Sequence, residues 1–197
     1  MLTPPSSARA LIFDCDGTLA ITRHMHFAAL RASLAEMGLT VTQDWYFART
    51  GMSMEPLCAD YEASYGVPLP MERLRPVYQR LVPNFLGEIR PNEPVLRVAR
   101  EHHGRLPLAV ASGGEQMVVE KTLEQIGARS LFEAVVAIGE ITKGKPAPDL
   151  FLAAAAKLGV EPAYCLVYED SDEGMEAAHA AGMPAIDVRG LDQIRRS

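Results

Sequence analysis

The stretch that decides the fold is ALIFDCDGT at residues 10–18. Its first four residues form a short apolar run, which is typical of a buried strand. Asp14 ends this run, and the Asp16-Gly17 pair that follows favours a turn. The sequence therefore predicts a buried strand that delivers two carboxylates to a tight turn.

Strand and helix patterns alternate along the second half of the chain. Apolar runs predict strands over residues 106–111, 134–138, 164–168 and 184–188. Helical patterns fall between them, over residues 94–102, from Gly113-Gly114 to near Gly127, 147–158 and 171–181. This alternation predicts an α/β fold with a doubly wound, Rossmann-like parallel sheet.

Residues 19–88 interrupt the alternation after the first strand. Helical patterns cover residues 22–37, 53–64 and 70–86, and this part shows no convincing strand. We therefore expect a small inserted all-helical cap over residues 19–88. Residues 1–18 and 89–197 are expected to form the α/β catalytic core.

Composition narrows the class of protein. The chain has 197 residues, 48% of them apolar, with a formal net charge of −6, which disfavours a nucleic-acid partner. No apolar run is long enough to span a membrane, and the first eight residues do not resemble a secretory signal. The three cysteines form no C-x-x-C pair. We expect a cytoplasmic monomer or weak homo-oligomer without nucleic-acid or membrane partners.

Polar residues with chemical potential follow four of the predicted strands. They are Asp14 and Asp16, Ser112 with Gly113 and Gly114, Lys145, and Glu169 and Asp170. Ligands of open parallel sheets bind beyond the carboxyl ends of the strands, so we expect these groups to converge. Four converging carboxylates need a cation, and oxygen ligands without His or Cys suit Mg²⁺.

The remaining groups are suited to a phosphate. Ser112 is predicted at the start of a helix, where a hydroxyl and free N–H groups bind anions and glycines allow close approach. Lys145 adds a positive charge for phosphoryl oxygens. Each feature alone has an ordinary explanation as a turn, a helix cap or a surface charge. Their shared location favours a site for phosphoryl transfer.

The motifs resemble a known family. Asp14-Cys15-Asp16-Gly17-Thr18, Ser112, Lys145-Pro146 and Glu169-Asp170 are similar, in this order, to the four motifs of the haloacid dehalogenase superfamily. The phrase GKPAPD at residues 144–149 and EDS at 169–171, with Gly174, resemble its β-phosphoglucomutase-like branch, which includes fructose-1-phosphatases.

The resemblance implies specific roles. Asp14 is the expected nucleophile and a Mg²⁺ ligand, and Asp16 the general acid and base whose backbone carbonyl also binds the metal. The expected phosphate-binding residues are Ser112, Gly113 and Lys145, and the further metal ligands are Glu169 and Asp170. The implied activity is Mg²⁺-dependent hydrolysis of a small phosphorylated metabolite, such as a sugar phosphate, through an aspartyl-phosphate.

In the cap the resemblance is weaker. His26 matches the usual histidine of the branch, and residues 49–53 resemble its substrate-contacting loop, so Arg49, Gly51 and Ser53 join His26 as candidate substrate contacts. Ile21 and Arg23 stand where the branch usually has acidic residues.

Two other activities fit the same residues. A phosphomutase of the β-phosphoglucomutase type would return the phosphate to another hydroxyl, although Thr18 favours a phosphatase. A catalytically silent binding protein is the alternative from another class, and the complete set of carboxylates with Lys145 argues against it.

Overall fold

The computed structural model describes residues 2–139, 141 and 143–189 of the chain. The chain divides into two compact units, Met1–Ile21 with Arg90–Ser197 and Thr22–Ile89. The first unit contains the sheet, and the second is helical. Within the described ranges, no helix combines the length and apolar character needed to cross a bilayer.

The sheet of the first unit is fully parallel. Its strands are β1 (Ala10–Phe13), β4 (Leu108–Glu115), β5 (Ala134–Ile138), β6 (Cys165–Glu169) and β7 (Ala185–Asp187). Their spatial order is β5-β4-β1-β6-β7, so the first strand of the chain lies at the centre. The register pairs Ile12 with Ala109 on one side and with Val167 on the other.

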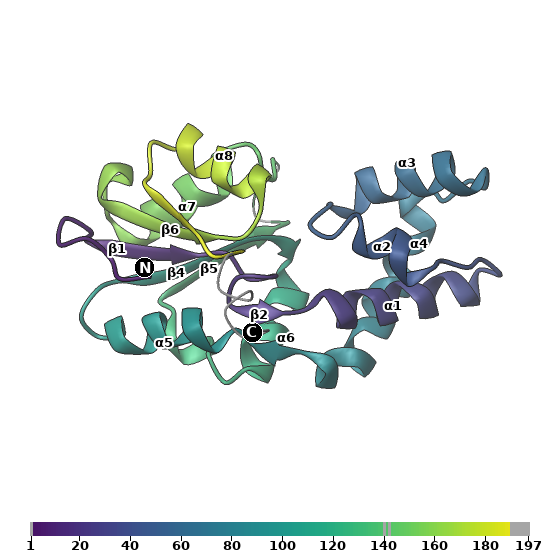
Figure 1. Ribbon diagram of the computed structural model, residues 1–197, viewed down its shortest axis with the longest axis horizontal. Coiled ribbons are helices and arrows are strands. Elements are labelled where there is room, and N and C mark those ends of the chain that lie inside the picture. Colours follow the sequence, from purple (N-terminus) through teal and green to yellow (C-terminus); the bar gives the residue numbers. More distant parts are fainter. Residues whose placement is uncertain (1, 140, 142, 190–197) are drawn as a thin grey trace, which may run out of the picture. The chain divides into compact units, whose positions relative to one another are not determined.

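Helices cover both faces of this sheet. Figure 1 shows α5 (Glu93–His102) and α6 (Gln116–Gln125) on one face, and α7 (Asp149–Leu158) and α8 (Asp172–Ala180) on the other. Crossover helices on both faces are the arrangement expected of a parallel sheet. The predicted doubly wound α/β fold is therefore confirmed.

The core alternates between the two faces of each strand. Ile12 of β1 belongs to the cluster under α7 and α8, together with Val136, Phe151 and Val167. On the other face, Phe13 stacks on Tyr168 with ring centroids 4.8 Å apart. Because β1 is buried on both faces, its sequence reads as a continuous apolar run.

Two strand features differ from the expectation: the end of β4 and an additional pair of short strands. The strand predicted over residues 106–111 extends through Glu115, so the helix expected from Gly113-Gly114 begins only at Gln116. A two-residue strand, β2 (Ala20–Ile21), pairs antiparallel with β3 (Arg90–Pro91). The expectation of no strand within residues 19–88 was therefore wrong for β2. Two residues are too few to show a period-2 pattern, so such a short strand has no recognisable pattern in the sequence.

The second unit consists of helices only. They are α1 (Arg23–Glu36), α2 (Gln43–Phe47), α3 (Met54–Tyr65), α4 (Met71–Leu81) and the 3₁₀ helix η1 (Val82–Glu88). The first unit adds the 3₁₀ turns η2 (Arg129–Leu131) and η3 (Pro162–Tyr164). The helix predicted to reach residue 86 ends at Leu81, because Pro83 lacks the N–H that an α-helix needs.

Candidate active site

The carboxyl ends of β1, β4 and β6 carry the polar groups of the site. Asp14 follows β1 directly, and its backbone N–H donates to Tyr168 O of β6 over 3.0 Å. Ser112 lies on β4, and Glu169 is the last residue of β6. These three strands are neighbours in the parallel sheet, so their carboxyl ends meet at one edge.

Three carboxylates and one lysine form the centre of the site. Asp14 and Glu169 are buried, and one carboxylate oxygen from each of Asp14, Glu169 and Asp170 lies within 4.8 Å of the other two. Lys145 Nζ donates to Asp14 Oδ1 over 2.6 Å and to Glu169 Oε2 over 2.7 Å. One ammonium therefore faces three carboxyl groups, which leaves negative charge to be balanced.

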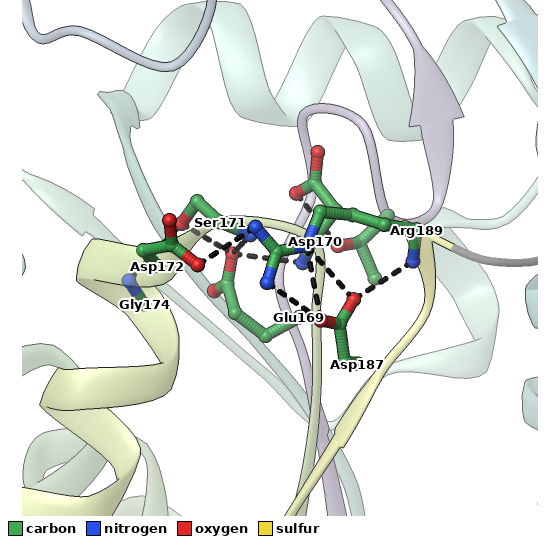
Figure 2. Close-up of polar contacts among 8 residues, drawn as sticks. Glu169, Asp170, Ser171, Asp172, Gly174, Asp187 and Arg189 are labelled. Carbon is green, nitrogen blue, oxygen red and sulfur yellow. Dashed lines mark hydrogen bonds and ion pairs between the residues drawn. The ribbon is translucent and has the colours of Figure 1, made fainter.

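The start of α8 fixes Glu169. Its Oε1 accepts hydrogen bonds from Asp170 N (3.0 Å), Ser171 N (3.0 Å) and Ser171 Oγ (2.8 Å). The same Ser171 hydroxyl caps α8 by accepting from Gly174 N over 3.0 Å, as Figure 2 shows. A Cβ on Gly174 would lie 2.0 Å from Glu169 Cδ, so glycine leaves the space that this carboxylate fills.

The turn after β1 supports Asp170. Gly17 has a φ of +90°, a left-handed conformation that favours glycine, and a Cβ there would lie 2.0 Å from Asp170 Oδ2. The buried Thr18 hydroxyl donates to Asp170 Oδ1 over 3.1 Å. Gly17 and Thr18 thus help to position Asp170, which directly follows β6.

The electrostatics show an excess of negative charge. Burial, reinforced by the charge of Glu169, raises the pKa of Asp14 well above its usual value, even though Lys145 lowers it. Burial and Glu169 likewise raise the pKa of Asp170 to about 7. Burial lowers the pKa of Lys145, but Asp14 and Glu169 outweigh it, so the net shift is upward. A hard cation bound by these oxygens would offset the remaining charge, so Asp14, Glu169 and Asp170 fit a magnesium site.

Ser112 does not begin a helix, contrary to the expectation. It lies within β4, where the pairing with β5 changes register between Ala111 and Glu115. Such a bulge redirects side chains and is common beside active sites. The buried Ser112 Oγ accepts from Gly114 N over 3.1 Å, and a Cβ on Gly114 would lie 3.3 Å from both Ser112 Oγ and Asp16 Oδ2. Asp16 and Ser112 therefore border the same small space.

A comparison with known proteins identifies the family. Residues 11–188 match the haloacid dehalogenase-like hydrolase family. The chain belongs to this family. It is 37% identical over 191 residues to the fructose-1-phosphate phosphatase YqaB of Escherichia coli (strain K12), an alignment covering 92% of this chain and 96% of that protein. It is 33% identical over 200 residues to the plasmid protein CbbY of Cupriavidus necator, covering 90% and 77%.

Solved structures share the fold of this chain. CbbY from Rhodobacter sphaeroides in complex with phosphate superposes with a TM-score of 0.80 at 25% identity, covering 91% of this chain and 85% of that one. A putative phosphoglycolate phosphatase from Lactobacillus plantarum also gives 0.80, at 20% identity, which shows the fold alone. As a haloacid dehalogenase-like member with these relatives, the chain is a phosphoric monoester hydrolase.

The cap candidates of this hydrolase lie within the helical unit. His26 Nδ1 is 2.5 Å from Tyr78 Oη. Arg49 pairs with Asp60, donates to Trp45 O over 2.9 Å and lies 4.2 Å over the Trp45 ring. These contacts hold the Arg49 guanidinium within its own unit.

The other two cap candidates are exposed. Gly51 has a φ of +99°, and Ser53 directly precedes α3 without a capping bond from its side chain.

Sequence reasoning missed three contributors to this haloacid dehalogenase-like site. Thr18 was read only through the motif, and its bond to Asp170 joins residues 152 positions apart. Gly174 matched the branch, but the close approach of Glu169 gave no signal in the sequence. Arg189 follows no predicted motif, and its bonds to Asp172 and Asp187 give no signal in the sequence.

Proposed function

We propose that this hydrolase is a Mg²⁺-dependent phosphatase of a small phosphorylated metabolite, a sugar phosphate, acting through an aspartyl-phosphate on Asp14. The observation that carries the proposal is the buried set of Asp14, Glu169 and Asp170 with Lys145 bonded to two of them. The relative named fructose-1-phosphate phosphatase, which matches almost end to end, supports the substrate class.

In this proposal, Asp14, Glu169 and Asp170 hold Mg²⁺ together with the backbone carbonyl of Asp16. When bound, the ion would offset charge on the phosphoryl oxygens and on the carboxylates. Lys145 contributes a fixed ammonium, and Ser112 with the Gly113 N–H donates to the remaining phosphoryl oxygens. Groups that are already oriented stabilise the charge of phosphoryl transfer without reorganisation.

The first step is attack by an Asp14 carboxylate oxygen on phosphorus. The bond between phosphorus and the ester oxygen breaks, and Asp16, which begins this step protonated, gives its proton to the departing alkoxide. The position of Asp16 beside Ser112 and Gly114 is consistent with a role at the phosphoryl group. A carboxylate nucleophile divides one difficult hydrolysis into two easier steps.

The second step releases phosphate. Asp16, now ionised, takes a proton from water as the water oxygen attacks the aspartyl-phosphate. The bond between phosphorus and the Asp14 oxygen breaks, which restores the Asp14 carboxylate and frees inorganic phosphate. One residue thus acts as acid and then as base.

The helical insertion, expected over residues 19–88, supplies substrate discrimination in this proposal. His26, Arg49, Gly51 and Ser53 are the proposed contacts to the sugar. Arg49 is already oriented by Asp60 and Trp45, so recognition would not require ordering a flexible side chain. A contribution from the cap would limit the enzyme to small esters.

Phosphate release from a panel of sugar phosphates, with and without Mg²⁺, tests the proposal. We expect Mg²⁺-dependent release by the wild type and none by Asp14→Asn, because a neutral amide is a poor nucleophile. Asp44→Asn, at an exposed aspartate of α2, is the matched control and should keep full activity.

Three results would contradict the proposal. If Asp14→Asn retained more than about a tenth of the activity, a barrier change below about 1.4 kcal/mol, Asp14 would not be the nucleophile. Transfer of phosphate between hydroxyls of one sugar, followed by ³¹P NMR, would identify a mutase. No turnover of any ester, with or without Mg²⁺, would identify a binding protein.

A further inference from the structure

Arg189 joins the end of β7 to the start of α8. Its Nε lies 3.0 Å from both carboxylate oxygens of Asp187, and its Nη2 donates to Asp187 Oδ2 over 2.6 Å. Its Nη1 lies 2.7 Å from Asp172 Oδ1, in the first turn of α8. Figure 2 shows the guanidinium between these two carboxylates.

The segment from Glu169 to Asp172 carries two of the proposed metal ligands, Glu169 and Asp170. At one end of this segment, β7 pairs with β6, with Asp187 opposite Glu169, and Val188 N donates to Glu169 O over 2.9 Å. At the other end, Asp172 follows Ser171 directly. The loop of Glu169, Asp170 and Ser171 is therefore closed on one side by the sheet and on the other by the Arg189–Asp172 pair.

The position of α8 determines the position of Glu169. The helix start supplies Ser171 N and Ser171 Oγ to the Glu169 carboxylate, and Gly174 leaves space for it. A shift of this helix end would move those donors away from Glu169. Any group that anchors the start of α8 to the sheet therefore acts on the geometry of the carboxylates.

We infer that Arg189 is a positioning residue of the metal site, which holds Glu169 and Asp170 in place through Asp172 and Asp187. The inference rests on the proposed magnesium site. A planar guanidinium engages two carboxylates in fixed directions at once, whereas a lysine ammonium is a point charge.

The contribution of Arg189 to overall stability is expected to be small. The side chains of Arg189, Asp187 and Asp172 are 46%, 39% and 89% exposed, and exposed ion pairs add little to folding. Metal affinity is more sensitive than stability, because mutation of residues that orient metal ligands commonly changes the affinity tenfold or more. The effect should therefore appear in Mg²⁺ binding and not in the melting temperature.

Isothermal titration of the full-length metal-free protein with Mg²⁺ tests the inference. Removal of a nearby positive charge alone would strengthen cation binding, whereas loss of positioning weakens it. We expect Arg189→Ala to weaken Mg²⁺ binding about tenfold, with a melting temperature close to that of the wild type. Arg189→Lys keeps the charge but loses the planar guanidinium, so we expect this variant to bind Mg²⁺ more weakly than the wild type.

Matched variants separate positioning from charge. Arg129→Ala removes an arginine that is 40% exposed and bonded to Glu120 and to Phe132 O, and it should leave Mg²⁺ affinity within about twofold. Asp172→Asn should weaken binding more than Glu173→Gln, which removes the neighbouring charge of the same helix turn. Combining Arg189→Ala with Asp172→Asn should cost no more than the larger single loss.

Two results discriminate between the possible failures. If wild-type protein and Asp170→Asn bind Mg²⁺ equally, the proposed metal site itself is wrong. If the wild type binds at Asp170 but Arg189→Ala binds as tightly or more tightly, only the positioning role is overturned.

Discussion

Gly174→Ala is the substitution for which local and tertiary effects predict opposite outcomes. Gly174 lies within α8, where alanine is favoured over glycine by up to about 1 kcal/mol. Helix propensity alone therefore predicts a more stable protein. The added Cβ, however, would lie 2.0 Å from Glu169 Cδ and 2.2 Å from Glu169 Oε2, well inside ordinary contact.

The cost follows from what Glu169 would lose. Its carboxylate accepts three bonds from Asp170 and Ser171 and one from Lys145. Bonds to a charged group contribute about 1.5–3 kcal/mol each, so displacement that breaks one of them costs about 1.5–3 kcal/mol. After the gain of up to about 1 kcal/mol in helix propensity, we expect a net loss of about 0.5–3 kcal/mol in the free energy of unfolding. Misplacement of the carboxylate should also lower kcat about 100-fold.

Urea unfolding and steady-state phosphate release measure these two effects. Gly87→Ala is the control, because a Cβ there has no neighbour within 4 Å and the change should stay within about 0.5 kcal/mol. Combining Gly174→Ala with Glu169→Asp shortens the displaced side chain, so the double variant should lose less stability than the two single losses added. Equal or higher stability of Gly174→Ala with wild-type turnover would refute the reasoning.

Three further predictions concern charge, phosphate and the cap. Because burial and Glu169 raise the pKa of Asp170 to about 7, the metal-free native state should lose stability as pH rises from about 4 to 7. Mg²⁺ should therefore raise the melting temperature more at pH 8 than at pH 5. Equal increases at the two pH values would contradict this. Ser112→Ala should lower kcat/KM at least about tenfold while the melting temperature changes little, and an unchanged kcat/KM would exclude Ser112 from phosphate binding. Arg49→Ala should reduce kcat/KM for the preferred sugar phosphate far more than for p-nitrophenyl phosphate, whereas equal losses, shared by Asp60→Asn, would assign Arg49 a structural role.

The strands were predictable where a short apolar run has a clear boundary in the sequence. The β1 and β5 ranges follow directly from short apolar runs, and Asp14 marks the end of the first. The end of β4 was not predictable, because Ser112-Gly113-Gly114 has the composition of a helix start. Pairing with β5 through a bulge overrides that local preference, and such pairing depends on contacts distant in sequence.

The convergence of the central site residues was predictable from topology. Asp14, Glu169 and Asp170 lie at or just after the carboxyl ends of neighbouring parallel strands, so the order of elements alone brings them to one edge. The support around them was not predictable in the same way. The bond of Thr18 to Asp170 and the double pairing of Arg189 depend on side-chain directions that no sequence period encodes.

The charge balance of the site supports the proposed Mg²⁺ ion beside Lys145. Lys145 lies 2.6 Å from Asp14, yet burial and the charge of Glu169 still raise the pKa of Asp14. A protonated Asp14 is a poor nucleophile, so this upward shift of its pKa opposes the proposed attack, and Lys145 alone does not offset the shift. A divalent cation between Asp14, Glu169 and Asp170 would lower the pKa of Asp14 and hold its carboxylate in the ionised form. In the proposed mechanism, the same ion would leave Lys145 able to face the phosphate.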